Sequence, residues 1–111
     1  MSGIKINYDS EGDILDVTLS ISIPQKRTAI ELNDNIILYM DIGFKKAIGL
    51  TVLSYSKILQ KRLKLNLDQL PGDRRDKLIK LLLKSPINLI LDVRGDTLKI
   101  HSTHLKELIA A

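Results

Sequence analysis

The chain has 111 residues and a formal net charge of +4, with 17 Lys and Arg against 13 Asp and Glu. Hydrophobic residues make up 44% of it and charged residues 27%, which is typical of a soluble globular protein and excludes a disordered, fibrous or collagen-like chain. Cysteine is absent, which excludes disulfide scaffolds, cysteine-based zinc sites, iron–sulfur clusters and thiol nucleophiles. At this length we expect a single domain, residues 1–111.

The first half of the chain has the two-residue hydrophobic period of β-strands. Apolar and polar residues alternate over 4–8 and 15–23, and the acidic turn between them predicts an antiparallel hairpin that ends before Pro24. Three more strands are predicted at 28–32, 36–42 and 47–53. Residues 4–55 therefore predict a β-meander of about five strands.

The period changes after residue 55, and residues 56–85 read as a helical segment. Ser56 is the predicted cap of a short helix through about Lys64. Asp73 is the predicted cap of a longer amphipathic helix through about Lys84, which Pro86 prevents from continuing.

Residues 87–111 predict a second hairpin and a short helix. The strands are expected at 87–93 and 97–101 around an Arg-Gly-Asp turn, and the helix from about Thr103. The whole predicts an α+β fold: an antiparallel sheet of about five strands, then helices, then a C-terminal hairpin and helix.

A Gly-Asp turn followed by an alternating strand occurs twice, at Gly12-Asp13 and at Gly95-Asp96. Gly-Asp is a common hairpin turn, so duplication and coincidence both stay open. The similarity indicates that the last hairpin extends or faces the first sheet.

Two stretches resemble a known family. The first is Tyr8-Asp9-Ser10-Glu11-Gly12-Asp13-Ile14-Leu15-Asp16-Val17-Thr18-Leu19-Ser20, and the second is Ala47-Ile48-Gly49-Leu50-Thr51-Val52-Leu53 followed by Ser56 and Lys57. Together, over about residues 4–58, they resemble the short prokaryotic family known as domain of unknown function 2283. The chain departs from that pattern at Asp16, at Thr51 and in the turn at 43–46.

That family has no established activity to carry over. Some of its members are encoded beside small toxin-like proteins, so the resemblance implies an antitoxin-like role, in which the protein neutralises a partner.

Candidate catalytic and metal-binding residues are few. Asp9, Glu11 and Asp13 alternate as the first ligands of a calcium loop do, but the rest of that loop is missing, and a solvated acidic turn is the favoured interpretation. His101 and His104, with Glu107 one helical turn further on, form the other candidate metal cluster.

Motifs for hydrolysis and phosphate binding are missing from the sequence. We therefore expect no catalytic residues, no cofactor and no metal, and a metal-dependent enzyme at the two histidines is a distant third hypothesis.

The charge is uneven along the chain. Residues 1–55 hold five basic and seven acidic side chains, and residues 56–111 hold twelve basic and six acidic ones. The candidate anion-binding or partner-binding residues are Arg74, Arg75, Lys77, Lys80 and Lys84. The alternative is that these side chains are the solvent face of an amphipathic helix.

The favoured function is a non-enzymatic protein-interaction module. Its partner is another protein or a second copy of the chain, because Ile37 and Tyr39 give the strand at 36–42 a second apolar side that a homodimer would cover. The alternative is weak, sequence-nonspecific nucleic-acid binding through the basic segment 57–84, although one Phe, three Tyr and no Trp leave few platforms for base stacking. No apolar stretch approaches the roughly 20 residues of a membrane span, and the N-terminus does not resemble a signal peptide, which predicts a cytoplasmic protein.

Overall fold

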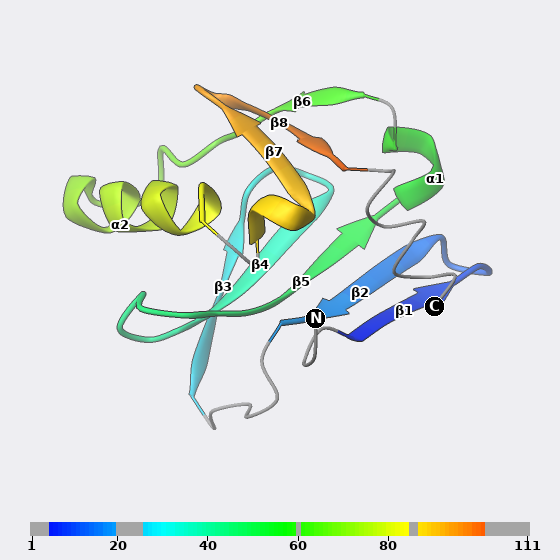
Figure 1. Cartoon of the computed structure of the whole chain (residues 1–111), viewed down its shortest axis with the longest axis horizontal. Coiled ribbons are helices and arrows are strands. Elements are labelled where there is room, and N and C mark those ends of the chain that lie inside the picture. Colours follow the sequence, from blue (N-terminus) through cyan, green and yellow to red (C-terminus); the bar gives the residue numbers. More distant parts are fainter. Residues whose placement is uncertain (1–4, 20–25, 60, 85–86, 102–111) are drawn as a thin grey trace.

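The computed structural model describes residues 5–19, 26–59, 61–84 and 87–101. Two antiparallel sheets and two α-helices make up most of this structure (Figure 1). In chain order the elements are β1 (Lys5–Asp9), β2 (Ile14–Thr18), β3 (Arg27–Glu31), β4 (Ile36–Asp41), β5 (Ala47–Leu53), α1 (Tyr55–Ile58), β6 (Arg62–Lys64), α2 (Gly72–Leu82), the 3-10 helix η1 (Ile87–Leu89), β7 (Leu91–Arg94) and β8 (Thr97–Ile100).

The larger sheet, sheet A, contains the five predicted strands in the order β1-β2-β5-β4-β3, all antiparallel. The meander predicted for residues 4–55 is therefore wrong, because β2 and β3 do not pair and β5 lies between β2 and β4. Length and burial fit the central place of β5. It is the longest strand described, and Ala47 to Leu50 are all buried, which suits a strand with a neighbour on each edge.

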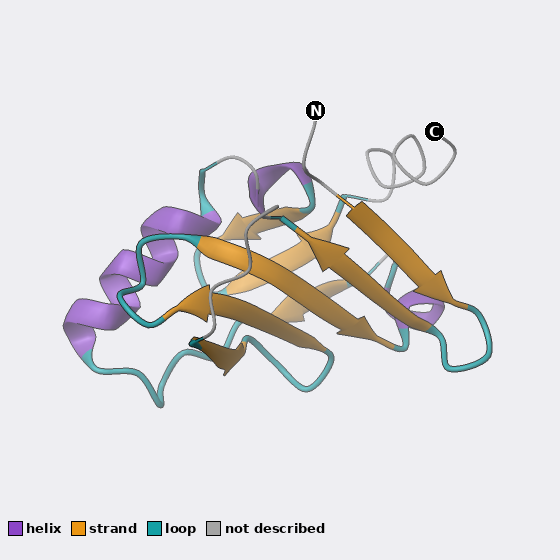
Figure 2. Ribbon diagram, turned by 90° about the horizontal axis from the view of Figure 1, so that it is seen from below, coloured by secondary structure: helices purple, strands orange, loops and turns teal. Residues whose placement is uncertain are grey.

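Alternation gives sheet A one buried face and one polar face. The residues that point into the core include Leu15, Leu38 and Leu50, each at most 1% exposed. On β4 the intervening residues Ile37 and Tyr39 are only half-buried, so this strand is not equally covered on its two sides. Figure 2 shows the five strands from the side away from the second layer.

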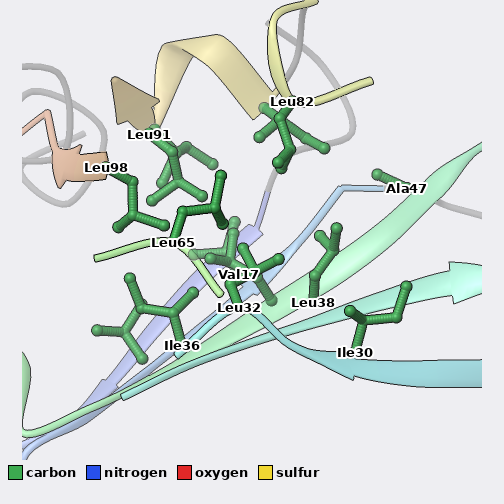
Figure 3. Packing of buried hydrophobic residues seen from close by; sticks show 14 of the residues in the cluster. Val17, Ile30, Leu32, Ile36, Leu38, Ala47, Leu65, Leu82, Leu91 and Leu98 are labelled. Atoms are coloured by element: carbon green, nitrogen blue, oxygen red, sulfur yellow. The ribbon is translucent and has the colours of Figure 1, made fainter. Parts of the chain in front are cut away.

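The second layer consists of α2, η1 and a three-stranded sheet, sheet B, of order β6-β8-β7. These elements lie on the same side of sheet A (Figure 1), so the C-terminal hairpin faces the first sheet, one of the two predicted arrangements. The core fills the space between the layers, where Leu82, Leu91 and Leu98 lie above Leu38 and Ile36 (Figure 3).

The short helix predicted from Ser56 to Lys64 is mostly wrong. The structure has one helical turn, Tyr55–Ile58, and then the strand β6, Arg62–Lys64. Pairing explains the strand: Arg62, Leu63 and Lys64 pair with Lys99, Leu98 and Thr97 of β8, so Leu63 turns inward while its charged neighbours turn outward. Partners more than 30 residues away decide this local structure.

The longer helix is present, as predicted, and α2 buries Leu78 and Leu82 completely. Its predicted cap is wrong: Pro71 occupies the N-cap position, and Asp73 lies inside the first turn without a capping hydrogen bond. An acidic residue there still interacts favourably with the positive end of the helix dipole.

The C-terminal hairpin is present as β7 and β8, with Gly95 at a φ of 58° in the turn. Its predicted first strand starts too early, because Ile87–Leu89 forms a 3-10 turn. The predicted last helix from Thr103 lies outside the described residues. Among the helices described, none has the length and apolar character needed to cross a bilayer.

Candidate partner-binding surfaces

The exposed side of α2 carries two of the five predicted binding residues, and a third follows the end of the helix. Lys77 and Lys80 are exposed, and their spacing places them on the side opposite Leu78 and Leu82. Lys84 is exposed in the turn just after α2. We call these three residues the α2 lysine face. Asp73 and Asp76 are exposed on the same helix, so negative charge is interleaved with the lysines.

The two arginines among the predicted residues do not belong to this face. The guanidinium of Arg74 lies over the ring of Phe44, 4.9 Å from its centroid. Arg75 is half-buried, and its Nη2 donates a 3.0 Å hydrogen bond to the carbonyl of Leu70. Both side chains thus hold α2 against its surroundings, and Arg74 stays exposed while Arg75 is partly covered.

Arg75 also borders a small hollow of about 150 Å³ beside the β7–β8 turn. Its Nε is buried without a hydrogen-bond partner, and two carboxylates, Asp68 and Asp96, lie at the same hollow. These acids oppose the binding of an anion there, so the hollow does not join the basic surface.

A second basic surface, which the sequence analysis did not find, covers the outer side of sheet B. Strand alternation directs six side chains away from the core, and we call this set the sheet-B face: Arg62, Lys64, Asp92, Arg94, Thr97 and Lys99. Four of the six are cationic and one is anionic. The alternation in Arg62-Leu63-Lys64 was the available signal, but a three-residue period-two pattern is too short to distinguish from a helix end.

Asp92 organises the sheet-B face. Its Oδ2 accepts from Nη2 of Arg62 at 2.6 Å and lies 3.2 Å from Nε of Arg94. Nη1 of Arg62 donates to Oγ1 of Thr97 as well, so this guanidinium spans the sheet from β6 to β7. The hydrogen bond from Arg62, with the charges of Arg94 and Arg62, lowers the pKa of Asp92 below its ordinary value.

The lysines of both surfaces keep unneutralised charge. Within the part of the chain that the structure describes, the salt bridges are those of Asp92 with Arg62 and Arg94. Lys64 and Lys99 on sheet B, like the α2 lysine face, therefore present positive charge without an acidic neighbour in ion-pair contact.

The acidic turn of the first hairpin is an internal junction. Asp9 accepts through Oδ1 from the backbone N–H of Glu11 at 3.1 Å. Asp13 accepts from the hydroxyl of Tyr8 at 2.7 Å, and from the N–H and hydroxyl of Ser56 at 3.0 and 2.7 Å. The carboxylates of Asp9 and Asp13 thus accept hydrogen bonds from groups of the protein itself. No cluster of three metal-ligating side chains occurs among the described residues.

The same junction sets the pKa values around it. Hydrogen bonds from Ser56 and then Tyr8 lower the pKa of Asp13, and the bond to Asp13 raises the pKa of Tyr8. Burial raises the pKa of Tyr55, whose ring meets that of Tyr8 edge-on at 5.5 Å between centroids. The pKa shift of Asp13 thus comes chiefly from the contact that joins the hairpin to α1, whereas that of Tyr8 comes chiefly from a hydrogen bond within the hairpin.

Only one residue of the predicted histidine cluster, His101, lies within the described residues. His101 is half-buried, and its backbone N–H donates to the carbonyl of Ile90 at 2.8 Å. His104 and Glu107 lie outside the described residues, so the structure does not bring the three predicted ligands together.

The outer side of sheet A holds a polar hollow of about 220 Å³ around Gly49. Asp16 borders it on β2 and accepts a 2.7 Å hydrogen bond from the hydroxyl of Thr51. On the opposite side Arg27 lies over the ring of Tyr39, 5.1 Å from its centroid. Sequence reasoning found Gly49 only as part of a strand, although a glycine inside a strand can mark a bulge or a close approach.

Comparisons with known proteins add no assignment: the chain matches no family model, no curated protein and no solved structure. The resemblance to domain of unknown function 2283 stays a prediction.

Proposed function

We propose that the protein is a non-enzymatic interaction module whose second layer binds an acidic surface of a protein partner. The observation that carries this proposal is the unneutralised positive charge on the α2 lysine face and on Lys64 and Lys99 of the sheet-B face. Residues 56–101 hold eleven Lys and Arg against five Asp and Glu, a net charge of +6. Opposed charges steer association and select the partner.

The surfaces favour a protein over nucleic acid for two reasons. Asp73 and Asp76 interrupt the α2 lysine face, which suits a mixed-charge protein surface and repels a phosphate backbone. The sheet-B face has no aromatic side chain on which a base could stack.

The test compares two triple variants of tagged protein in a pull-down from extract of the source organism. One variant replaces Lys77, Lys80 and Lys84 by Ala, and the control replaces the exposed first-layer residues Lys5, Lys26 and Lys45. Both remove three positive charges, so a difference between them reports position and not net charge.

We expect a protein eluting in fixed ratio, insensitive to nuclease, whose recovery falls about tenfold in the α2 variant and little in the control. A nuclease-sensitive eluate without a stoichiometric protein would replace this proposal by nucleic-acid binding. Equal losses in the two variants would show that net charge alone drives capture. An antitoxin-like role is one form of the proposed function, and the identity of a stoichiometric partner would test it.

A further inference from the structure

The edge strand β3 has an open side. Its residues, Arg27–Glu31, pair with β4 alone, and within the described structure no other backbone group bonds to them. Arg27, Ala29 and Glu31 are exposed, whereas Ile30 is 3% exposed and anchors the strand in the core. An unpaired edge held rigidly by the core is a ready template for another strand.

The hydrogen bonding at the end of β3 shows which groups face outward. The N–H of Leu32, just after β3, donates to the carbonyl of Ile36 at 2.9 Å, so this N–H points toward β4, while the carbonyl of Leu32 accepts from the N–H of Asn66. The backbone N–H and C=O groups of successive residues in an antiparallel strand point to opposite sides, so those of Ile30 and Thr28 also point toward β4. The N–H and C=O groups of Arg27, Ala29 and Glu31 therefore point to the open side.

These three residues are self-complementary. When β3 pairs antiparallel with β3 of a second copy, with Ala29 opposite Ala29, Arg27 of each chain lies opposite Glu31 of the other. All three positions are hydrogen-bonded pairs in this register, giving about six backbone hydrogen bonds with opposed side chains near 5.5 Å at Cα. We propose that two copies of the chain associate through β3 in this two-fold arrangement and form one continuous ten-stranded sheet.

The neighbouring side chains suit this register. Ala29 pairs with Tyr39 on β4, so two small side chains would lie at the centre of the interface, between the two Tyr39 rings. On the core side, Thr28 of one chain would lie opposite Ile30 of the other. Within the described residues, Glu31 has no ion-pair partner, and Arg27 contacts the face of Tyr39, which leaves its N–H donors available.

The other edge of sheet A that is open within the described structure, β1, is a poorer template. Its charges, Lys5 and Asp9, could also oppose one another, but Asp9 already accepts from the N–H of Glu11 in the adjoining turn. None of its five residues is fully buried, so β1 lacks the anchor that Ile30 gives β3. It provides a matched control edge.

The proposed contact is short, so we expect weak association. A stable interface buries about 1,200–2,000 Å² in total, more than a five-residue strand edge provides. Sedimentation equilibrium over about 10 µM to 1 mM covers the affinity range of such small contacts.

The test uses single charge reversals at the two ends of β3. Arg27→Glu places a carboxylate opposite Glu31, and Glu31→Arg places a guanidinium opposite Arg27, twice in each dimer because of the two-fold axis. Each variant alone should dimerise about tenfold or more weakly than the wild type. An equimolar mixture of the two variants should recover association, because every cross-strand pair in the mixed dimer is again of opposite charge.

Two further variants separate this interface from other effects. Ala29→Pro removes an N–H that has no partner among the described residues of one chain, so it should keep the monomer folded and abolish the dimer. Lys5→Glu on β1 should leave dimerisation unchanged. A wild-type chain that stays monomeric to 1 mM, a mixture that fails to associate, or a loss caused by Lys5→Glu and not by Arg27→Glu would each overturn the proposal.

Discussion

Ser56 binds the carboxylate of Asp13 twice, through its backbone N–H to Oδ1 at 3.0 Å and through its hydroxyl to Oδ2 at 2.7 Å. The two residues are 43 positions apart in the chain. The N-cap residue of α1, Ser54, makes no side-chain cap, so Asp13 supplies from another element the acceptor that the first turn needs. This pair joins the first hairpin to the start of the second layer.

Replacing Asp13 should therefore loosen this junction. We expect Asp13→Ala to lower the Tm by about 5 °C, because it removes the cap and puts alanine at a φ of 56°. Asp13→Asn should cost less, since Asn tolerates the left-handed region and keeps one carbonyl acceptor. Glu11→Gln, an exposed change in the same turn, is the control for thermal denaturation and should leave the Tm nearly unchanged.

The pKa of Asp13 adds a pH dependence with a defined sign. Its pKa is lowered in the folded protein, chiefly by the hydrogen bonds from Ser56, so the ionised form stabilises the fold. That contribution is fully present above the ordinary pKa of 3.8 and is lost as the pH falls through the lower, folded value. In urea denaturation from pH 6 to pH 2, the advantage of the wild type over Asp13→Asn should shrink only below about pH 4. A constant difference across this range would contradict the assigned shift.

Sequence patterns predicted the strands of sheet A, helix α2 and the C-terminal hairpin, because each has an apolar period that matches its own geometry. The patterns did not predict the order of sheet A, since the choice between pairing β2 with β3 or with β5 depends on which strand must be buried on both edges. They also misassigned Arg62–Lys64, whose strand conformation comes from pairing with β8.

The candidate surfaces, like the fold, were predicted only in part from the sequence. The helical spacing of Lys77 and Lys80 was sufficient to place them on one face of α2, whereas Lys84 lies in the turn after the helix. Nothing in the local sequence could place Arg74 on Phe44, or bring Arg62 to Asp92 across a neighbouring strand. Such contacts join segments that meet only after the two layers pack.

The sheet-B face predicts that the Tm of the wild type and the Tm of Asp92→Asn respond differently to added salt. In the wild type, Asp92 compensates Arg62 and Arg94, so added NaCl should leave the Tm unchanged or lower it slightly. Asp92→Asn leaves four cations and no anion on this face, and their repulsion should lower the Tm at low salt.

Screening should then relieve that repulsion. We expect the Tm of Asp92→Asn to rise by about 2–4 °C between 0.05 and 0.5 M NaCl, measured by scanning calorimetry. Asp96→Asn removes the same charge from the exposed β7–β8 turn and should respond to salt as the wild type does. Parallel salt curves for the two variants would show that Asp92 has no special compensating role.

Gly49 provides the sharpest test of packing in sheet A. It pairs with Thr18 on β2 and Tyr39 on β4, next to an irregularity where Ile48 is the extra residue on β5. A Cβ added at Gly49 would lie 2.6 Å from the carbonyl oxygen of Val17, and this obstacle is backbone, which cannot turn aside as a side chain can. The close approach of β2 and β5 therefore requires glycine at this position.

We expect Gly49→Ala to lower the free energy of unfolding by about 2–4 kcal/mol, measured from urea denaturation midpoints. Gly72→Ala is the matched control, because nothing lies within 4 Å of its added Cβ and alanine favours a helix. The control should change stability by no more than about 1 kcal/mol, in the stabilising direction. If Gly49→Ala were as stable as the wild type, β2 and β5 would have to separate freely at this point. The hollow around Gly49 would then change shape as well, because both strands form its walls.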